Sequence, residues 1–372
     1  MAPPGVRRHE NRTYRSTDRP SRFFSRYQYR VGFSSGRRIG RGKSRAPGNS
    51  RDMTTTKRLR IQDPGDIVAL VPTVLGFHPT ESLVMLTFAR GAQAFHARID
   101  LPEDPTANSE VIEVLIRAAV ANAVDAVVVL AYSADADRAA EILSDSLRAM
   151  MAAALEVIDL ISVQGEGWFE VVPDAPSGRG ESGHCDVESH WFTAQNVLDG
   201  RVTHRSRADL AATLTPVAED VERVALFFDD LEVPEAVEGL AAEGGWLAHT
   251  TQLQIAGVGQ LTDATAARLI VGLGNARLRD LVCSLVTRST AEAHVSLWSD
   301  VLRRCPEPGI ADVASVLAFS SWLSGQGALA WCALDWVWPR QPWHPLGRRV
   351  AELLEHAVSP RLWEVPVASA QA

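Results

Sequence analysis

The sequence predicts an α/β domain with a mixed β-sheet, followed by an all-helical domain. In residues 58–173, short apolar runs bounded by turn residues alternate with amphipathic segments, a pattern typical of alternating strands and helices. A polar, glycine-rich stretch follows at 174–190, and beyond it apolar residues recur almost wholly at helical spacing. These changes predict a head at 1–52, an α/β domain at 53–173, a linker at 174–205, a helical domain at 206–364 and a tail at 365–372.

The α/β domain opens with clear start and stop signals. Asp63 can cap a helix that has Pro64 at its first position and Gly76 at its end. A hairpin of two strands, at 82–89 and 94–101, is predicted next, because polar and apolar residues alternate in its second strand.

The later elements follow from periodicity in the same way. The rest of the α/β domain is predicted to contain helices at 109–123 and 134–154 and strands at 125–132, 156–165 and 168–173. The helical domain is predicted to contain helices at 206–214, 216–228, 262–273, 276–287, 290–304, 310–324, 327–338 and 346–357.

Composition places the chain among soluble globular proteins. A hydrophobic content of 46% and a charged content of 22% are ordinary for that class. No apolar run approaches the ~18 residues that a membrane span needs, and no apolar segment follows the early arginines as a signal peptide requires. The four cysteines are far apart, which favours reduced thiols. We therefore expect a cytoplasmic protein.

Charge divides the chain sharply at about residue 52. Residues 1–52 contain fourteen Lys/Arg and three Asp/Glu, a net charge of +11, whereas the remainder carries a net charge of −19. The acidic remainder argues against a nucleic-acid surface on the folded part. Three interpretations of the head stay open. The first is that translation starts at Met53 and the head is a mis-assigned start. The second is a disordered arm that binds anionic lipid, or nucleic acid through arginines interleaved with aromatic residues. The third is a transit peptide.

The C-terminal part contains one segment that resembles a tetratricopeptide-like helical hairpin. Residues 322–342 place Trp322 in the first helix and Gly325 in the turn, and a small–large–small pattern lies in the second helix. Tryptophans are concentrated here. They are either core residues or a partner-binding surface, since tryptophan is enriched at interface hot spots. The candidates for the partner surface are Trp322, Trp331, Trp336 and Trp338.

Three stretches together resemble a known family. They are PGDIVALVPTVLGFHPTESLVML, VLDGRVTHRSRADLAATLTP, and GQGALAWCALDWVW with the following LGRRVAELLEHAVSPRLWE. Their order and spacing are similar to an actinobacterial family known only as a domain of unknown function (DUF 4192). The resemblance covers nearly all of 58–364 and none of 1–52, so it favours the start at Met53. It implies no catalytic residues. Family members are expected to carry a cysteine cluster after the last strand of the first domain, where this chain has Cys185 alone.

The first candidate site lies in the opening PGD and GFHPTES segments. Asp66, His78, Glu81 and Ser82 are expected near one end of the sheet, where open α/β sheets place their ligands. A histidine beside a carboxylate and a hydroxyl can perform acid–base or acyl-transfer chemistry. The alternative is a purely structural connection between a helix and a strand. Ser82 lacks the G-x-S-x-G elbow that exposes a nucleophile.

The second candidate is a metal site in HCDVESH. His184, Cys185 and His190 have side chains that zinc accepts. Their spacing matches no standard zinc signature, so a solvated linker is the alternative. No cofactor can be assigned from the sequence.

Two functions remain open from the sequence. The preferred hypothesis is a non-catalytic binding or regulatory protein that uses its helical C-terminal part for a protein partner. The alternative is an enzyme or metabolite sensor with a site formed by the PGD and GFHPTES segments. Membrane association is not expected, and nucleic-acid binding is expected only if residues 1–52 are translated.

Overall fold

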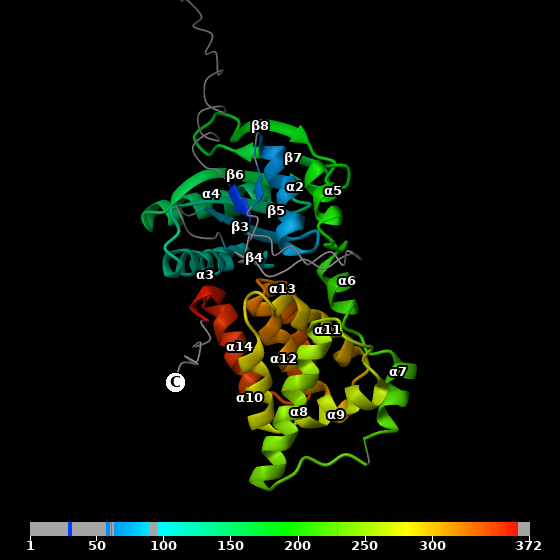
Figure 1. Cartoon of the computed structure of the whole chain (residues 1–372). Helices are drawn as coiled ribbons and strands as arrows, with labels where there is room; N and C mark the ends of the chain where they lie inside the picture. The colour runs from blue at the N-terminus through cyan, green and yellow to red at the C-terminus, as the bar shows by residue number, and fades with distance from the viewer. Residues whose placement is uncertain are drawn as a thin grey trace, which may run out of the picture.

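The computed structural model describes residues 63–88, 95–228 and 230–363 in full, together with Ile61 and the backbone of Tyr29–Val31 and Lys57–Leu59. The described chain forms an α/β half and a helical half, which Figure 1 shows one above the other. The order of the elements confirms the predicted α/β part followed by a helical part. Among the described helices, none is both long and apolar enough to cross a membrane.

A six-stranded mixed sheet forms the centre of the α/β half. Its strand order is β4-β3-β5-β6-β7-β8, in which β5 and β6 are parallel and the other neighbours are antiparallel. A separate antiparallel pair joins β1 to β2. The strands are β1 Tyr29–Val31, β2 Lys57–Leu59, β3 Ser82–Phe88, β4 His96–Asp100, β5 Ala126–Tyr132, β6 Glu156–Gln164, β7 Gly167–Val171 and β8 Arg179–His184.

Helices cover both faces of this sheet. Along β3, Leu83 and Met85 pack in a core with α3 and α4, whereas Val84 and Leu86 pack in a core with α2 and α5. Since successive side chains of a strand point to opposite faces, the apolar run of β3 can serve both cores. The helices are α2 Pro64–Leu75, η1 Pro105–Ala107, α3 Asn108–Ala121, α4 Ala136–Ala152 and α5 Trp191–Leu198.

The signals around α2 act as predicted. The Asp63 carboxylate accepts the N–H of Asp66, Pro64 is the first residue of the helix, and Gly76 follows its last residue. Gly76 has a φ of 81°, a conformation that glycine adopts without strain.

The predicted linker contains two regular elements. Strand β8 extends the sheet as an edge strand with every side chain exposed, and α5 packs on α2 through the buried Phe192. The polar sequence of β8 lacks the apolar alternation by which strands are recognised. Residues 179–198 therefore belong to the α/β half.

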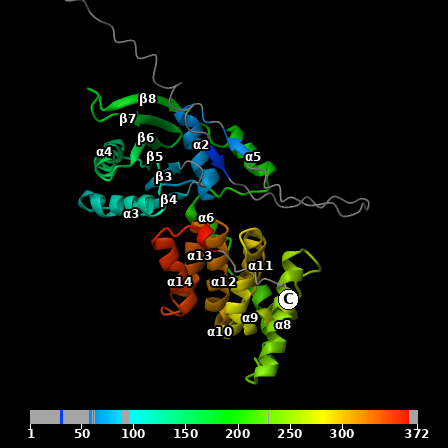
Figure 2. The same cartoon turned by 60° about the vertical axis from the view of Figure 1, so that its left-hand side comes forward.

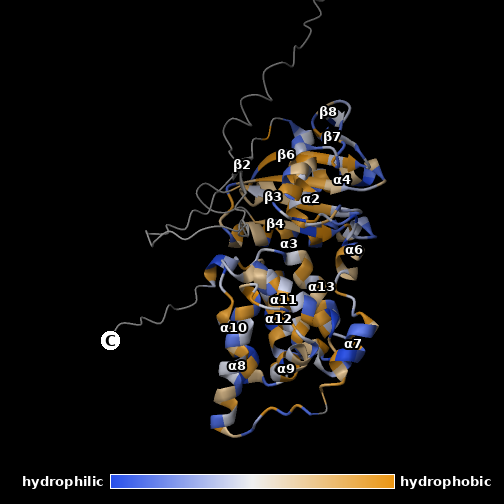
Figure 3. Ribbon diagram, turned by 45° about the vertical axis from the view of Figure 1, so that its right-hand side comes forward, coloured by the Kyte–Doolittle hydropathy of each residue, from blue (hydrophilic) through white to orange (hydrophobic). Residues whose placement is uncertain are grey.

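In the part of the helical half that the structure describes, nine α-helices surround or include α12 at the centre. All fourteen residues of α12 are buried, and Figure 3 shows hydrophobic residues concentrated on this helix. The helices are α6 Arg207–Ala212, α7 Ala218–Ala225, α8 Val237–Ile255, α9 Asp263–Leu273, α10 Ala276–Leu285, α11 Ala291–Arg303, α12 Ile310–Leu323, α13 Gly327–Val337 and α14 Pro345–Glu355, with short 3-10 turns η2 Glu307–Gly309 and η3 Pro360–Leu362.

The two halves share a bonded seam. Phe77 follows α2, yet it is 2% exposed and packs in the core of the helical half. Beside it, the N–H of His204 donates to the Gly76 carbonyl at 2.8 Å, and the N–H of His78 donates to the His204 carbonyl at 3.0 Å. A second contact joins Asn122 Nδ2 to a carbonyl after α14 at 2.8 Å. Figure 2 shows α6 between the halves, directly after this seam.

Candidate functional site

Asp66, the first residue of the predicted site, pairs with a histidine from the predicted linker. Its carboxylate lies 3.0 Å from His190 Nε2, and the two side chains are 10% and 17% exposed. His190 caps α5, because its Nδ1 accepts the N–H of Phe192 at 3.3 Å. An accepting Nδ1 leaves the proton of a neutral imidazole on Nε2, which then donates to Asp66. The pair therefore ties the start of α5 to the first turn of α2.

The other two metal candidates do not join His190. The Cys185 thiol is buried and donates to the Gly65 carbonyl at 3.4 Å. Burial, together with the charges of Asp63, Asp66 and Asp186, raises the pKa of the Cys185 thiol to about 11.

A thiol with this pKa remains protonated at neutral pH and is a poor nucleophile and metal ligand. His184 lies on the exposed edge strand, where its Nε2 is 2.8 Å from the Glu166 carboxylate. Among the described residues, no group of three or more His, Cys, Asp or Glu side chains is placed to hold a metal ion.

Glu81 lies at the carboxyl end of β5, in front of α4. Its carboxylate accepts the hydroxyl of Ser133 at 3.0 Å and the N–H of Ala134 at 2.9 Å, and Arg138 lies 3.8 Å away. The Glu81 backbone has a φ of 40°, in the left-handed region that residues other than glycine rarely adopt. The N–H of Leu101 donates to the Glu81 carbonyl at 2.9 Å. These contacts hold a carboxylate where an anionic ligand of an α/β sheet would lie.

Ser82 and His78 lie in two further environments. The Ser82 hydroxyl donates to the Thr80 carbonyl at 2.6 Å and accepts Arg98 Nε at 2.9 Å. Neither partner of this hydroxyl can remove its proton, so the arrangement is not that of an activated nucleophile. His78 is half-buried beside the seam, and burial lowers its pKa although the charge of Glu188 opposes the shift.

The four residues of the predicted pocket are thus distributed over several environments. Asp66 contacts His190, Glu81 contacts the start of α4, and Ser82 contacts Arg98, while His78 bonds through its backbone at the seam. Asp66, Glu81 and Ser82 are thus each bonded to a different element, namely α5, the start of α4 and β4. The His190 partner of Asp66 is 124 residues away along the chain, and its N-terminal position on α5 was the one available signal.

The helical half contains a second histidine–aspartate pair. His344 caps α14, because its Nδ1 accepts the N–H of Gly347 at 3.1 Å. Its Nε2 lies 3.0 Å from the Asp312 carboxylate on α12, which also accepts the guanidinium of Arg279 on α10. His344 is 1% exposed, and Arg279 and Asp312 are 7% and 11% exposed. This network joins three helices inside the helical core.

The comparisons with known proteins identify the family. The chain matches the family described as Domain of unknown function (DUF4192) over residues 64–361, well over half of its length. The chain belongs to this family. Comparison with curated proteins and comparison with solved structures each found no match. In this DUF4192 domain, the match extends from the first helix of the α/β half to the last turn of the helical half, and it includes both histidine–aspartate pairs.

The tryptophans predicted to form a partner surface are in part core residues of the DUF4192 domain. Trp322 is 4% exposed, and its indole N–H donates to the Val358 carbonyl at 3.1 Å. It therefore presents no surface to a partner in this conformation. Trp331, Trp336 and Trp338 are partly buried against the same core.

A tryptophan outside that prediction is the most exposed in the described chain. Trp343 is 77% exposed, in the short connection between α13 and α14. The Arg348 guanidinium lies 5.0 Å from the centroid of its ring. Beside it in the sequence, His344 is buried and bonded at both ring nitrogens. The exposed indole therefore projects from an anchored loop.

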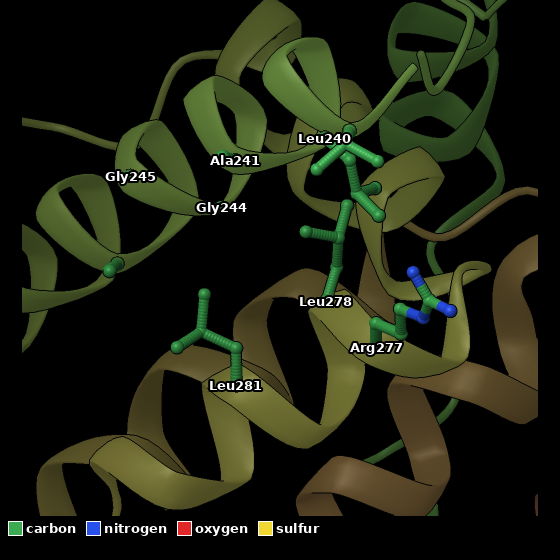
Figure 4. Close-up of a pocket in the computed structure, with 9 residues that line it drawn as sticks. Leu240, Ala241, Gly244, Gly245, Arg277, Leu278 and Leu281 are labelled. Atoms are coloured by element: carbon green, nitrogen blue, oxygen red, sulfur yellow. The ribbon is translucent and has the colours of Figure 1, made fainter. Parts of the chain in front are cut away.

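An open apolar groove separates α8 from α10. Its volume is about 450 Å³, and Arg277 is the one charged residue that lines it. Figure 4 shows Leu278 and Leu281 pointing from α10 toward the glycines of α8. A Cβ atom on Gly244 would lie 3.1 Å from a Leu281 methyl group, so glycine allows the two helices to approach closely. The groove offers hydrophobic contact, and it contains no pair of acid and base groups.

Proposed function

We propose that this DUF4192 protein is a non-catalytic binding or regulatory protein that engages a protein partner through its C-terminal helical part. The observation that carries the proposal is Trp343, a large apolar side chain exposed on an anchored loop. Tryptophan and arginine are the residues most enriched in interface hot spots, and here Arg348 stacks on the indole.

Preorganisation of the Trp343 loop supports the proposal. Pro342 and Pro345 restrict the backbone on either side, and the imidazole of His344 is bonded to α12 and to the first turn of α14. A loop that is already ordered loses little conformational freedom when a partner binds, so more of the contact energy remains as affinity.

The preceding helical hairpin belongs to the same proposal. Helices α12 and α13 pack closely and are joined by a turn in which Gly325 has a φ of 82°. We liken this hairpin to a single tetratricopeptide unit whose end presents Trp343. Since a unit of this kind needs neighbours to cover its faces, the surrounding helices of the domain would take the place of further repeats.

The experiment that tests the proposal is affinity capture from native lysate with the full chain as bait. Trp343→Ala is compared with the wild type and with Trp191→Ala, a matched control because Trp191 is 47% exposed on the α/β half. We expect at least one protein to be recovered equally by the wild type and Trp191→Ala and about tenfold less by Trp343→Ala. Equal recovery by all three baits, or no reproducible protein, contradicts the proposal.

One observation favours the alternative, an enzyme or metabolite sensor. Left-handed backbone at a residue other than glycine is concentrated at functional sites, and Glu81 has this conformation beside the carboxyl end of β5. A thermal-shift screen against nucleotides, metals and metabolites tests it. A ligand at about 100 times its Kd stabilises by about 2.7 kcal/mol. The alternative requires such a shift to be lost in His78→Ala and Glu81→Gln.

A further inference from the structure

Residues 226–238, which are the connection between α7 and α8 with the first two residues of α8, contain five acidic residues and no basic one. Leu231 and Val233 pack against the helical core, whereas the alternating Asp230 and Glu232 are exposed. The inward residues therefore hold this acidic segment on the domain, and its acidic side faces solvent. Figure 1 shows the segment along the lower edge of the helical half.

The acidic segment also exposes apolar side chains. Leu226 and Val237 at its two ends are 78% and 73% exposed, and Phe227 is 41% exposed. The described acidic residues of the segment, Asp230, Glu232, Glu235 and Glu238, form no ion pair with any residue that the structure describes. The segment is thus an exposed surface that combines negative charge with hydrophobic contact area.

The loop around Trp343 has the opposite charge. Residues 339–349 contain three arginines and no acidic residue. Arg340 pairs with Glu307, but Arg348 and Arg349 are exposed and have no ion pair within the described ranges. We name Trp343, Arg348 and Arg349 the Trp343 corner. In a folded part whose net charge is −19, this corner is a local basic and aromatic surface.

The two surfaces complement each other in charge and in hydrophobic character. The corner requires a partner that supplies carboxylates for its arginines and apolar side chains around its indole. The acidic segment of the same chain supplies both, with Glu232 and Glu235 between Leu226 and Val237. Complementary charges across an interface direct the encounter and select against other partners.

We infer that a second copy of this chain occupies the Trp343 corner, by docking its acidic segment there. The inference rests on the proposed function, because it names the partner of the same surface. Trp343 inserts beside Val237 of the second copy, and Arg348 and Arg349 pair with the nearby Glu232 and Glu235.

The arrangement of the two surfaces determines the kind of assembly. They are different patches of one chain, so each pair of copies can make the contact twice about a two-fold axis and form a closed dimer. If the two-fold arrangement is sterically blocked, the same contact made once per copy extends into an open chain.

Charge reversal with rescue tests the inference on the full-length protein. One variant carries Arg348→Glu and Arg349→Glu, and the other carries Glu232→Arg and Glu235→Arg. Each variant alone brings like charges together, whereas the mixture of the two restores opposite charges at both contacts of a dimer. Sedimentation equilibrium follows the molar mass up to about 0.5 mM protein, at roughly 0.1 M salt so that surface charges still act.

We expect the wild type to self-associate with rising concentration, each variant to associate about tenfold more weakly, and the mixture to recover the wild-type affinity. Trp343→Ser provides a further variant with unchanged charge and the same expected loss. Thermal unfolding midpoints confirm that each variant is folded.

A wild type that stays monomeric over the whole range overturns the inference, as does a mixture that fails to recover association between folded variants. A monomeric wild type that still captures another protein through Trp343 retains the proposed function, and it assigns the corner to a different acidic partner. If the wild type neither self-associates nor captures another protein through Trp343, the proposed function is overturned as well.

Discussion

The α/β half and the helical half each begin a helix with a histidine bonded to a buried aspartate, and the two pairs differ in their surroundings. Both imidazoles accept a backbone N–H through Nδ1 and approach the carboxylate through Nε2 at 3.0 Å. The two aspartates are about equally buried, at 10% exposed for Asp66 and 11% for Asp312, whereas His190 is 17% and His344 only 1% exposed. Asp312 also binds the buried Arg279.

This difference teaches that breaking the same kind of histidine–aspartate pair can cost different amounts of folding free energy. At the edge of the α/β half, water can replace part of a lost hydrogen bond. In the helical core, Arg279 depends on Asp312 for its counter-charge, since an unpaired buried charge is strongly destabilising. Each pair also has an exposed tryptophan next to its histidine, Trp191 in one half and Trp343 in the other.

The largest expected effect comes from breaking the pair in the helical core. Asp312→Asn leaves the Arg279 charge buried without a counter-ion, so we expect the free energy of unfolding to fall by about 3–5 kcal/mol. Urea unfolding measures the change. Asp335→Asn is the matched control, because Asp335 pairs with Arg207 at the surface, and its cost should stay below about 1 kcal/mol. A loss below about 1 kcal/mol for Asp312→Asn would contradict this account.

The α/β half is expected to lose stability as pH rises, through Asp159 on β6. Burial, with the charges of Glu170 and Glu181 on the next two strands, raises the pKa of the Asp159 carboxyl to about 7. Between about pH 4 and 7 the unfolded chain releases this proton before the folded chain does, so stability falls across that window.

Asp159→Asn should remove this part of the pH dependence and stabilise the protein by on the order of 2 kcal/mol at pH 8. Unfolding of both proteins by urea at pH 5 and pH 8 measures the effect. The Asp159 account is wrong if the two proteins lose equal stability between these pH values.

A smaller effect is expected at the pair in the α/β half. His190→Ala removes the cap of α5 and the hydrogen bond to Asp66, which together should cost about 1–2 kcal/mol. His184→Ala is the control, since His184 pairs with Glu166 on an exposed strand. Hydrogen exchange should show faster opening of α5 with little change in α12. A uniform change in both halves would show that the pair acts globally.

The smallest effect on stability is expected at the two exposed tryptophans. Trp343→Ala and Trp191→Ala should each change the free energy of unfolding by less than about 1 kcal/mol, because Trp343 is 77% and Trp191 47% exposed. Their binding behaviour should differ, as the capture experiment measures. If Trp343→Ala is strongly destabilising, then its indole has a structural role and the corner is no longer a free surface.

Local chemistry made much of the fold predictable. The capping carboxylate of Asp63, the proline after it and the left-handed Gly76 define α2 within a few residues, and the apolar run of β5 could only be a covered strand. These features depend on neighbours in the sequence, so they can be read before the structure is known.

Features that depend on distant residues could not be predicted in the same way. Helix α8 contains three glycines, a composition that argues against a helix. The folded chain explains Gly244, because a larger residue there would crowd Leu281 of α10. The pairing of Asp66 with His190 likewise needs α5 to fold back onto α2. The Trp343 corner was missed because exposure is a property of the folded chain, and the sequence shows only a tryptophan-rich segment.

Phe77 has a consequence for how the molecule can be divided. Phe77 follows α2 of the α/β half, but its side chain packs in the core of the helical half. Its neighbours Gly76 and His78 form backbone hydrogen bonds with His204. A chain cut between the halves would place an aromatic side chain in water on one fragment and leave a hole in the other. We therefore expect unfolding to be cooperative across the seam, with both halves unfolding in one transition.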